Sequence, residues 1–189
     1  MMRYVEKIAE NIWKIKADSN VYFLDFEEKI LIDTGNRKNR SILEQFLKPM
    51  INFERISKVI FTHLHYDHIG NFDLFRNAEF FASEESIESL KNNPFNEILD
   101  EEMAHKFKVD LMPLHDFDGL QILKTPGHTK GSICLWYEKE KILFSGDTLF
   151  FNKKMGRVDL PTSAPEDLRK SLVYLLNYNF KVLCPGHEY

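Results

Sequence analysis

The sequence has little cysteine and no long run that is hydrophobic or of one charge. Its two cysteines, Cys134 and Cys184, cannot form a disulfide framework, and each lies in an apolar run where a free thiol packs as a small hydrophobe. No stretch approaches the roughly 20 apolar residues that span a bilayer. The amino terminus lacks the apolar core of a signal peptide. We therefore expect a reducing, cytoplasmic location and no membrane partner.

An excess of one charge is also missing. The 25 basic and 29 acidic residues are intermixed and give a formal net charge of -4, so the sequence lacks the basic surface of a nucleic-acid-binding protein. We expect a small molecule, not a nucleic acid, as the partner. The hydrophobic content of 43%, with sixteen phenylalanines, is enough for a core without disulfides. One domain over residues 1–189 is expected, and the oligomeric state stays open.

Short apolar runs alternate with turn residues and with helical patterns. Strands are expected at 12–15, 21–24, 30–32, 58–61, near 79–81, and at 120–123, 133–136, 142–144 and 182–184. Helices are expected at 42–50 and 163–176, and the region 83–105 is expected to be helical. We assign the strand near 79–81 to the second of two similar halves. Each half should be a sheet covered by helices on one side, with the two sheets face to face, in an α/β or α+β layered domain.

The last predicted helix carries two further expectations. Ser163 and Glu166 have the spacing of a capping box around Pro165. Four leucines at helical spacing should form its buried stripe, namely Leu168, Leu172, Leu175 and Leu176.

Residues that can bind metals follow four of the predicted strands. The strand ending at Phe61 leads into His63-Leu64-His65-Tyr66-Asp67-His68, a density of imidazoles that solvated loop histidines do not explain. If that strand stays extended, His63 and His65 project on one side and could share an ion. The other three blocks each add one residue, so that the candidates are His63, His65, Asp67, His68, His128, Asp147 and His187.

This donor set suits two divalent metal ions, with zinc favoured and iron or manganese as alternatives. Two ions about 3.5–4 Å apart would hold a water between them and lower its pKa towards about 7, so hydrolysis is the expected chemistry. Asp33 follows the strand at 30–32 and either orients a ligand or forms a turn. Arg157 either contacts substrate or is a solvated charge. His105 and His115 lie outside every block and are assigned to the surface or to packing.

The motif His63-x-His65-x-Asp67-His68, followed by the three single ligands, resembles the ligand set of the metallo-β-lactamase superfamily. The resemblance covers nearly the whole chain and implies an α+β fold, the αβ/βα four-layer sandwich. It also implies one metal held by His63, His65 and His128, a second held by Asp67, His68 and His187, and Asp147 as the bridge.

Within the superfamily, segments 125–132, 145–150 and 186–189 resemble the glyoxalase II group, thioesterases that hydrolyse S-acyl-glutathione. Tyr189 matches a tyrosine with which that group contacts glutathione. Arg157 stands where the group has a lysine, and Asp159 where it has a tyrosine. The chain ends at Tyr189 without the group's helical carboxy-terminal domain, as short bacterial and archaeal relatives do. The resemblance thus implies a short-form thioesterase, with Arg157 and Tyr189 as expected substrate contacts.

The predicted reaction is attack of a metal-bridging hydroxide on a thioester or ester carbonyl. Asp67 and Asp147 are the catalytic carboxylates, and we expect both to be fixed as metal ligands. One alternative is a persulfide dioxygenase with a single iron on residues matching His63, His128 and Asp147. A lactonase or other esterase, and a non-catalytic metal-binding domain, are further alternatives.

Overall fold

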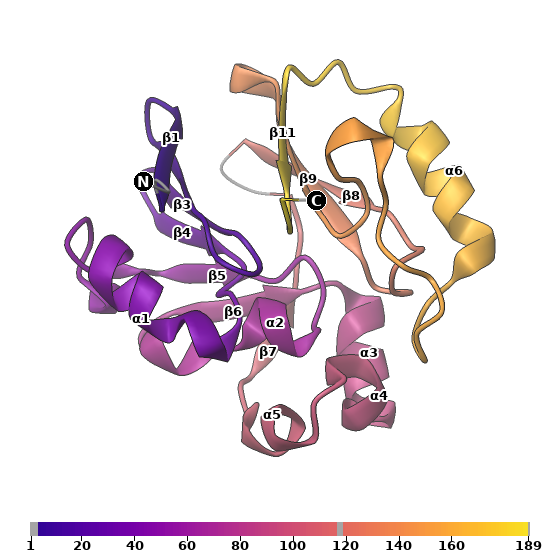
Figure 1. Ribbon diagram of the computed structural model, residues 1–189, viewed down its shortest axis with the longest axis horizontal. Helices are drawn as coiled ribbons and strands as arrows, with labels where there is room; N and C mark the ends of the chain where they lie inside the picture. Colours follow the sequence, from indigo (N-terminus) through magenta and orange to yellow (C-terminus); the bar gives the residue numbers. More distant parts are fainter. Residues whose placement is uncertain (1–3, 117–118, 189) are drawn as a thin grey trace.

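The computed structural model describes residues 4–116 and 119–188 and has two β-sheets that pack face to face (Figure 1). Within the described residues, the first sheet has seven strands in chain order. Strands β1 to β4 pair antiparallel, and β4 to β7 pair parallel. The strands of this sheet are β1 (Val5–Ala9), β2 (Ile12–Ile15), β3 (Val21–Asp25), β4 (Lys29–Ile32), β5 (Lys58–Ile60), β6 (Glu79–Ala82) and β7 (Leu111–Pro113).

The second sheet has four strands within the described residues, in the order β11-β10-β9-β8. They are β8 (Leu120–Lys124), β9 (Ile133–Tyr137), β10 (Ile142–Gly146) and β11 (Val182–Pro185). The halves are therefore unequal, and the assignment of the strand near 79–81 to the second half was wrong. Strand β6 pairs parallel with β5, with Val59 opposite Phe80, and so extends the first sheet.

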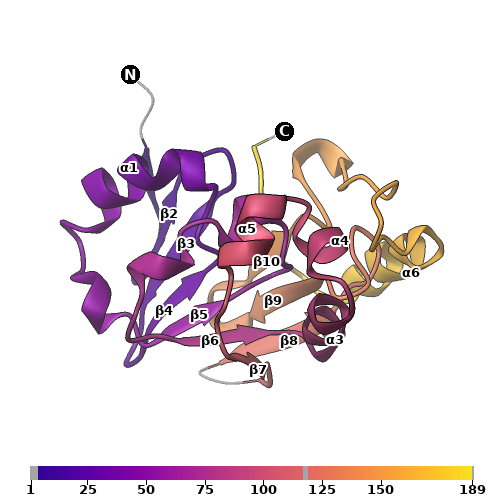
Figure 2. The same ribbon diagram turned by 90° about the horizontal axis from the view of Figure 1, so that it is seen from below.

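Alternation along the strands builds the layers, because successive side chains point to opposite faces. In β3, Val21 and Phe23 pack among the helices on the outer face of the first sheet, while Tyr22 and Leu24 pack between the sheets. Strands β9 and β10 alternate in the same way between the inter-sheet core and a smaller cluster that includes Leu175 of α6 (Pro165–Leu175). The predicted α+β four-layer sandwich is confirmed, with α6 covering the second sheet (Figure 2).

The region over 83–105 is helical, as expected, and consists of three short helices. Ser83, Asn93 and Asp100 each cap a new helix with a side-chain oxygen, and Leu99 ends the middle one in the left-handed conformation with φ of 64°. These three caps within eighteen residues divide the helical region into separate short helices. The three helices are α3 (Glu84–Asn92), α4 (Pro94–Ile98) and α5 (Glu101–Lys106).

Two expectations for α6 were also wrong. Ala164, not Ser163, precedes the helix, and the Ser163 hydroxyl donates to the His128 carbonyl at 2.7 Å instead of capping. Leu176 is 81% exposed because it follows the end of the helix.

At the helix expected over 42–50, one turn of α1 (Arg40–Ile42) continues as the wider π-helix η2 (Leu43–Leu47). The other short helices are η1 (Arg37–Asn39), η3 (Phe53–Arg55), α2 (Tyr66–Ile69), η4 (Phe72–Leu74), η5 (Glu138–Glu140) and η6 (Phe151–Lys153).

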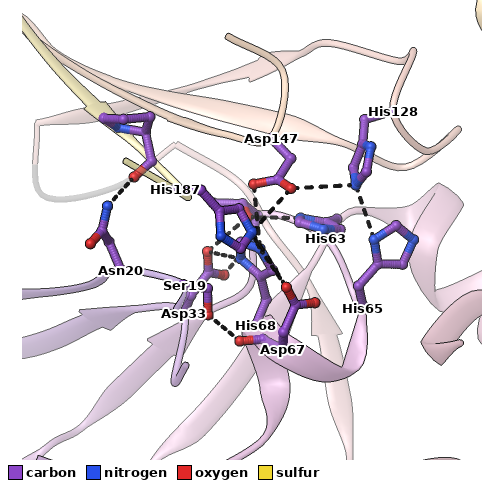
Figure 3. Close-up of polar contacts among 12 residues, drawn as sticks. Ser19, Asn20, Asp33, His63, His65, Asp67, His68, His128, Asp147 and His187 are labelled. Carbon is purple, nitrogen blue, oxygen red and sulfur yellow. Dashed lines mark hydrogen bonds and ion pairs between the residues drawn. The ribbon is translucent and has the colours of Figure 1, made fainter. Parts of the chain in front are cut away.

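The arrangement brings the candidate residues to one edge of the sandwich. Strands β8, β10 and β11 run in the same direction, so the loops that carry His128, Asp147 and His187 leave the second sheet at a common edge. The loop after β5 in the first sheet meets them there (Figure 3). Among the described helices, none is long and apolar enough to cross a membrane.

Candidate metal centre

Seven side chains predicted from the sequence converge at this edge (Figure 3). The donor atoms of His63, His65 and His128 lie within 4.8 Å of one another, and so do those of Asp67, His68 and His187. We name these groups the first triad and the second triad. Strand β5 ends at Ile60, so His63 and His65 meet through the loop geometry and not through the strand alternation expected above.

The distances between donor atoms fit shared metal ions. His65 Nδ1 lies 3.0 Å from His128 Nε2 in the first triad, and His68 Nε2 lies 3.4 Å from His187 Nε2 in the second. Two nitrogens that each sit 2.0–2.1 Å from a tetrahedral zinc ion are about 3.3–3.4 Å apart. The two triads therefore have nearly the spacing that such an ion requires.

Asp147 lies between the two triads. Its Oδ1 is 3.4 Å from His68 Nε2, and its Oδ2 is 3.6 Å from His128 Nε2 and 3.4 Å from His187 Nε2. Buried polar atoms normally have a hydrogen-bond partner, yet Asp147 Oδ1 and His63 Nε2 have none among the described residues. Both residues belong to one group with His68 that could hold an ion. The donor set thus fits metal binding with a carboxylate shared between two positions.

The outward-facing ring nitrogens of four histidines are held by protein oxygens. His63 Nδ1 lies 3.1 Å from the Thr62 hydroxyl, and His68 Nδ1 lies 2.8 Å from Asp33 Oδ2. His128 Nδ1 and His187 Nδ1 donate to backbone carbonyls, those of Arg157 at 2.8 Å and of Asp18 at 2.6 Å. Such contacts fix the tautomer and leave the Nε2 lone pair directed into the site.

Asp33, for which the sequence left two roles open, is a buried hub beside the site. Its Oδ1 accepts from the Thr62 backbone at 2.8 Å, and its Oδ2 accepts from the Thr62 hydroxyl at the same distance while also facing His68. Its φ of 58° is a conformation that aspartate tolerates better than most residues. Asp33 therefore orients His68 directly and His63 through Thr62.

Two glycines allow the backbone to approach the ligands closely. A Cβ on Gly186 would lie 2.2 Å from Asp147 Oδ1 and 2.8 Å from His68 Cε1. A Cβ on Gly156 would lie 2.2 Å from the Asp147 carbonyl and 2.9 Å from His128 Nδ1. Real side chains do not tolerate such distances, so these positions require glycine.

The electrostatic environment shifts the histidine pKa values of the two triads in opposite directions. Burial, followed by the charges of His128 and His68, lowers the pKa of His65 to about 3. Burial acts against protonation of His187 as well, but hydrogen bonds to Asp147 and Asp67 outweigh it and raise the pKa of His187 to about 9. Although burial acts to raise it, the pKa of Asp147 lies well below its usual range because His68 and His187 surround it. Anionic carboxylates held among nitrogen donors are an arrangement that attracts cations.

A cleft of about 360 Å³ opens onto the ligands. Phe150, Met155 and Leu160 give it an apolar wall, and Tyr66 and Arg157 also line it. Arg157 makes two hydrogen bonds of 2.7 Å to the Asp159 carboxylate. Tyr189, the other expected substrate contact, lies outside the described residues.

Sequence reasoning missed several residues around the ligands. Thr62, Asp18, Ser19 and Asn20 contact ligand residues or their neighbours but looked like ordinary turn residues. A glycine next to each of the three single ligand blocks was the available signal for close backbone approach. His105 and His115 are exposed and lie away from the site.

Known proteins resemble this chain over most of its length. A probable metallo-hydrolase of Streptococcus pyogenes serotype M6 is 30% identical over 96% of this chain and 83% of its own length. A hydroxyacylglutathione hydrolase of Francisella philomiragia is 28% identical over 90% of this chain, which spans only 63% of that protein. The crystal structure of TTHA1623 in a di-iron-bound form has the same fold, with a TM-score of 0.73, 24% identity, and coverage of 93% of this chain and 91% of that one.

The family profile described as the metallo-beta-lactamase superfamily matches residues 16–187. This range contains every strand from β3 to β11 and all seven residues of the candidate metal centre. The chain therefore belongs to the metallo-beta-lactamase superfamily.

Proposed function

We propose that this protein is a metal-dependent hydrolase that binds two divalent ions and cleaves the thioester bond of a small S-acyl-glutathione-like substrate. The observation that carries the proposal is the position of the Asp147 carboxylate, whose two oxygens face histidines of both triads at 3.4–3.6 Å. A carboxylate so placed suits a bridge between two ions. Zinc is the favoured metal, and iron or manganese would also accept this donor set.

In this proposal the first triad would hold one ion, the second triad would hold the other, and Asp147 would be shared between them. When bound, the ions would supply a water of lowered pKa as the nucleophile and would stabilise negative charge on the carbonyl oxygen. Asp67 and Asp147 act through their charge and position. Neither is a free general base, because their oxygens face the ligand nitrogens.

The cleft supports a thioester over an amide. Besides the candidate ligands, the described residues that line it include only Tyr66 and Arg157 as ionisable groups. An amide nitrogen needs a positioned acid to leave, whereas a thiol of pKa about 8.5 leaves readily as a thiolate. A site without a dedicated acid therefore favours a thiolate leaving group. The likeness to hydroxyacylglutathione hydrolases supports the same substrate class.

We further propose that the apolar wall contacts the acyl group and that Arg157 and Tyr189 contact the thiol carrier. The Arg157 side chain is 65% exposed at the cleft and already pairs with a carboxylate in two-point geometry. A substrate carboxylate could replace Asp159 in that pair.

Anaerobic hydrolysis tests the proposal. S-lactoylglutathione, a simple thioester without carboxylates, an oxygen ester and a lactone would be assayed with the metal content measured in parallel. We expect the two thioesters to be cleaved without oxygen. Oxygen consumption on glutathione persulfide by protein with one iron would contradict the hydrolase, and cleavage of the lactone or ester alone would contradict the thioester.

A charge-removing variant tests the carrier contact. Arg157→Gln should raise KM for S-lactoylglutathione and leave KM for the carboxylate-free thioester unchanged. Arg169→Gln, on the exposed side of α6, is the matched control and should change neither. An equal rise for both substrates in Arg157→Gln would contradict the contact.

A further inference from the structure

The connection between β2 and β3, residues 16–20, contacts two ligands of the second triad that lie far apart in the sequence (Figure 3). The Ser19 hydroxyl donates to the backbone carbonyl of Asp67. His187 Nδ1 donates to the carbonyl of Asp18 at 2.6 Å. Ligand residues separated by 120 positions are thus held by two adjacent residues of one loop.

Asn20 fixes the backbone that carries His187. Its backbone N–H donates to the Gly186 carbonyl at 2.7 Å, and its Nδ2 donates to the Pro185 carbonyl at 3.0 Å. The same Nδ2 lies 3.0 Å from Glu188 Oε1, so Asn20 contacts residues on both sides of His187. Ser19 and Asn20 are both 0% exposed, and such buried hydrogen bonds keep one geometry.

The connection is itself held in place. Asn36 Nδ2 donates to Asp18 Oδ2 at 2.8 Å, and the Asp18 backbone N–H donates to Asn39 Oδ1 at 3.2 Å. These contacts tie residues 16–20 to the segment around η1. The connection is therefore fixed by hydrogen bonds to Asn36 and Asn39 as well as by its contacts with the ligands.

The first triad has a separate brace from another part of the chain. The Ser163 hydroxyl donates to the His128 carbonyl at 2.7 Å, and His128 Nδ1 donates to the Arg157 carbonyl at 2.8 Å. Ser19 and Ser163 thus make the same kind of contact, a buried or half-buried hydroxyl on the carbonyl of one ligand, at opposite ends of the centre.

We propose that Ser19 and Asn20 are positioning residues for the ion of the second triad and control its affinity separately from that of the first. The inference rests on the proposed binuclear centre and adds which residues tune each half. Loss of an outer partner of a metal ligand typically lowers metal affinity by about 10- to 100-fold. Ser19→Ala should therefore lower the affinity for the ion of the second triad by this factor and leave the affinity for the ion of the first triad unchanged.

The test is titration of the metal-free protein with Zn²⁺ by calorimetry and with Co²⁺ by visible absorption. Co²⁺ spectra distinguish a three-histidine site from a site with two histidines and a carboxylate. For Ser19→Ala we expect the latter site to weaken by about 10- to 100-fold and the three-histidine site to remain unchanged. Ser163→Ala, the matched control, should show the opposite pattern. Asn20→Ala should act in the same direction as Ser19→Ala.

The outcomes separate this inference from the proposed function. If wild-type protein binds two ions and Ser19→Ala keeps both affinities, or loses both equally, the inference is wrong and the binuclear centre stands. If wild-type protein binds a single ion at saturation, the binuclear centre fails and the inference with it. Thermal unfolding of the metal-free variants identifies a general loss of structure, and the comparison then rests on Ser19→Ala against Ser163→Ala, which each remove one hydroxyl.

Discussion

Asp33 Oδ2 lies 2.8 Å from His68 Nδ1, although the two residues are 35 positions apart. The same carboxylate accepts two hydrogen bonds from Thr62, each 2.8 Å long. It therefore joins the end of β4 to the loop that carries the first ligands. Three buried donors depend on this one side chain.

Asp33→Ala should lower the stability of the metal-free protein. Each buried donor left without an acceptor costs roughly 1–3 kcal/mol, so we expect the free energy of unfolding to fall by at least about 2 kcal/mol. Urea unfolding in the presence of a chelator measures it. Asp25→Ala, which removes only a half-exposed pair with Lys29 at 3.0 Å, should cost less than about 1 kcal/mol. Equal losses in the two variants would contradict the hub role of Asp33.

Gly186→Ala should disrupt metal binding. The new Cβ would lie 2.2 Å from Asp147 Oδ1, so the carboxylate or the backbone must shift by more than a few tenths of an ångström. We expect metal content and turnover to fall together, because Asp147 faces both triads. Gly119→Ala is the control for backbone strain, since Gly119 has a φ of 78° that disfavours alanine but lies away from the centre, where its added Cβ would be 3.5 Å from the Tyr137 ring; it should keep its metal. Retention of full metal content by Gly186→Ala would contradict the described geometry.

The ligand set was predictable because the metal-binding residues lie in short sequence segments. Each segment follows a strand whose apolar run is visible in the sequence, and strands that run in one direction end at one edge. The residues that hold the ligands in position were not predictable. Ser19 and Asn20 have the composition of any turn, and their partners lie 48 and 165 positions away, so only the tertiary structure identifies them.

Competition between local and tertiary contacts explains the wrong expectation for the start of α6. Ser163 has capping-box spacing, but its hydroxyl contacts the His128 carbonyl, which the local pattern cannot anticipate. The region over 83–105 is helical as expected, and its division at Asn93 and Pro94 follows from the cap that Asn93 provides for a new helix. The placement of β6 in the first sheet depended on strand pairing, about which periodicity carries no information.

Glu97 should make the stability of the metal-free protein depend on pH. Burial raises the pKa of Glu97, against the hydrogen bond that the Ser89 hydroxyl donates to Glu97 Oε2 at 2.6 Å, which acts to lower it. A raised pKa in the fold means that the protonated form stabilises the protein. This stabilisation is complete below the usual pKa of 4.5 and is lost as the pH rises through the pKa in the fold.

Glu97→Gln removes this titration. We expect the stability of the variant relative to wild type to be greater at pH 8 than at pH 5, as measured by urea unfolding at both values. Glu101→Gln, on the exposed face of α5, should show a smaller change between the two pH values. A relative stability of Glu97→Gln that does not change with pH would argue against a buried, titrating carboxylate.

Both thiols should be unreactive in the folded protein. Burial raises the pKa of Cys134 to about 11 and that of Cys184 to about 12, so little thiolate exists at neutral pH. Ellman's reagent should detect no thiol in native protein and two after unfolding. Rapid reaction of either thiol in the native state would contradict the packing of β9 or β11.

Metal titration of Asp147→Asn, with thioester hydrolysis measured on the same samples, is the decisive test of the proposed binuclear centre bridged by Asp147. We expect wild type to bind two ions and turn over substrate, and we expect the variant to lose at least tenfold in affinity for one ion and nearly all turnover. Asp167→Asn, an exposed pair with Lys170, should match wild type in both. Two ions bound at wild-type affinity with undiminished turnover in Asp147→Asn would show that Asp147 does not bridge two ions.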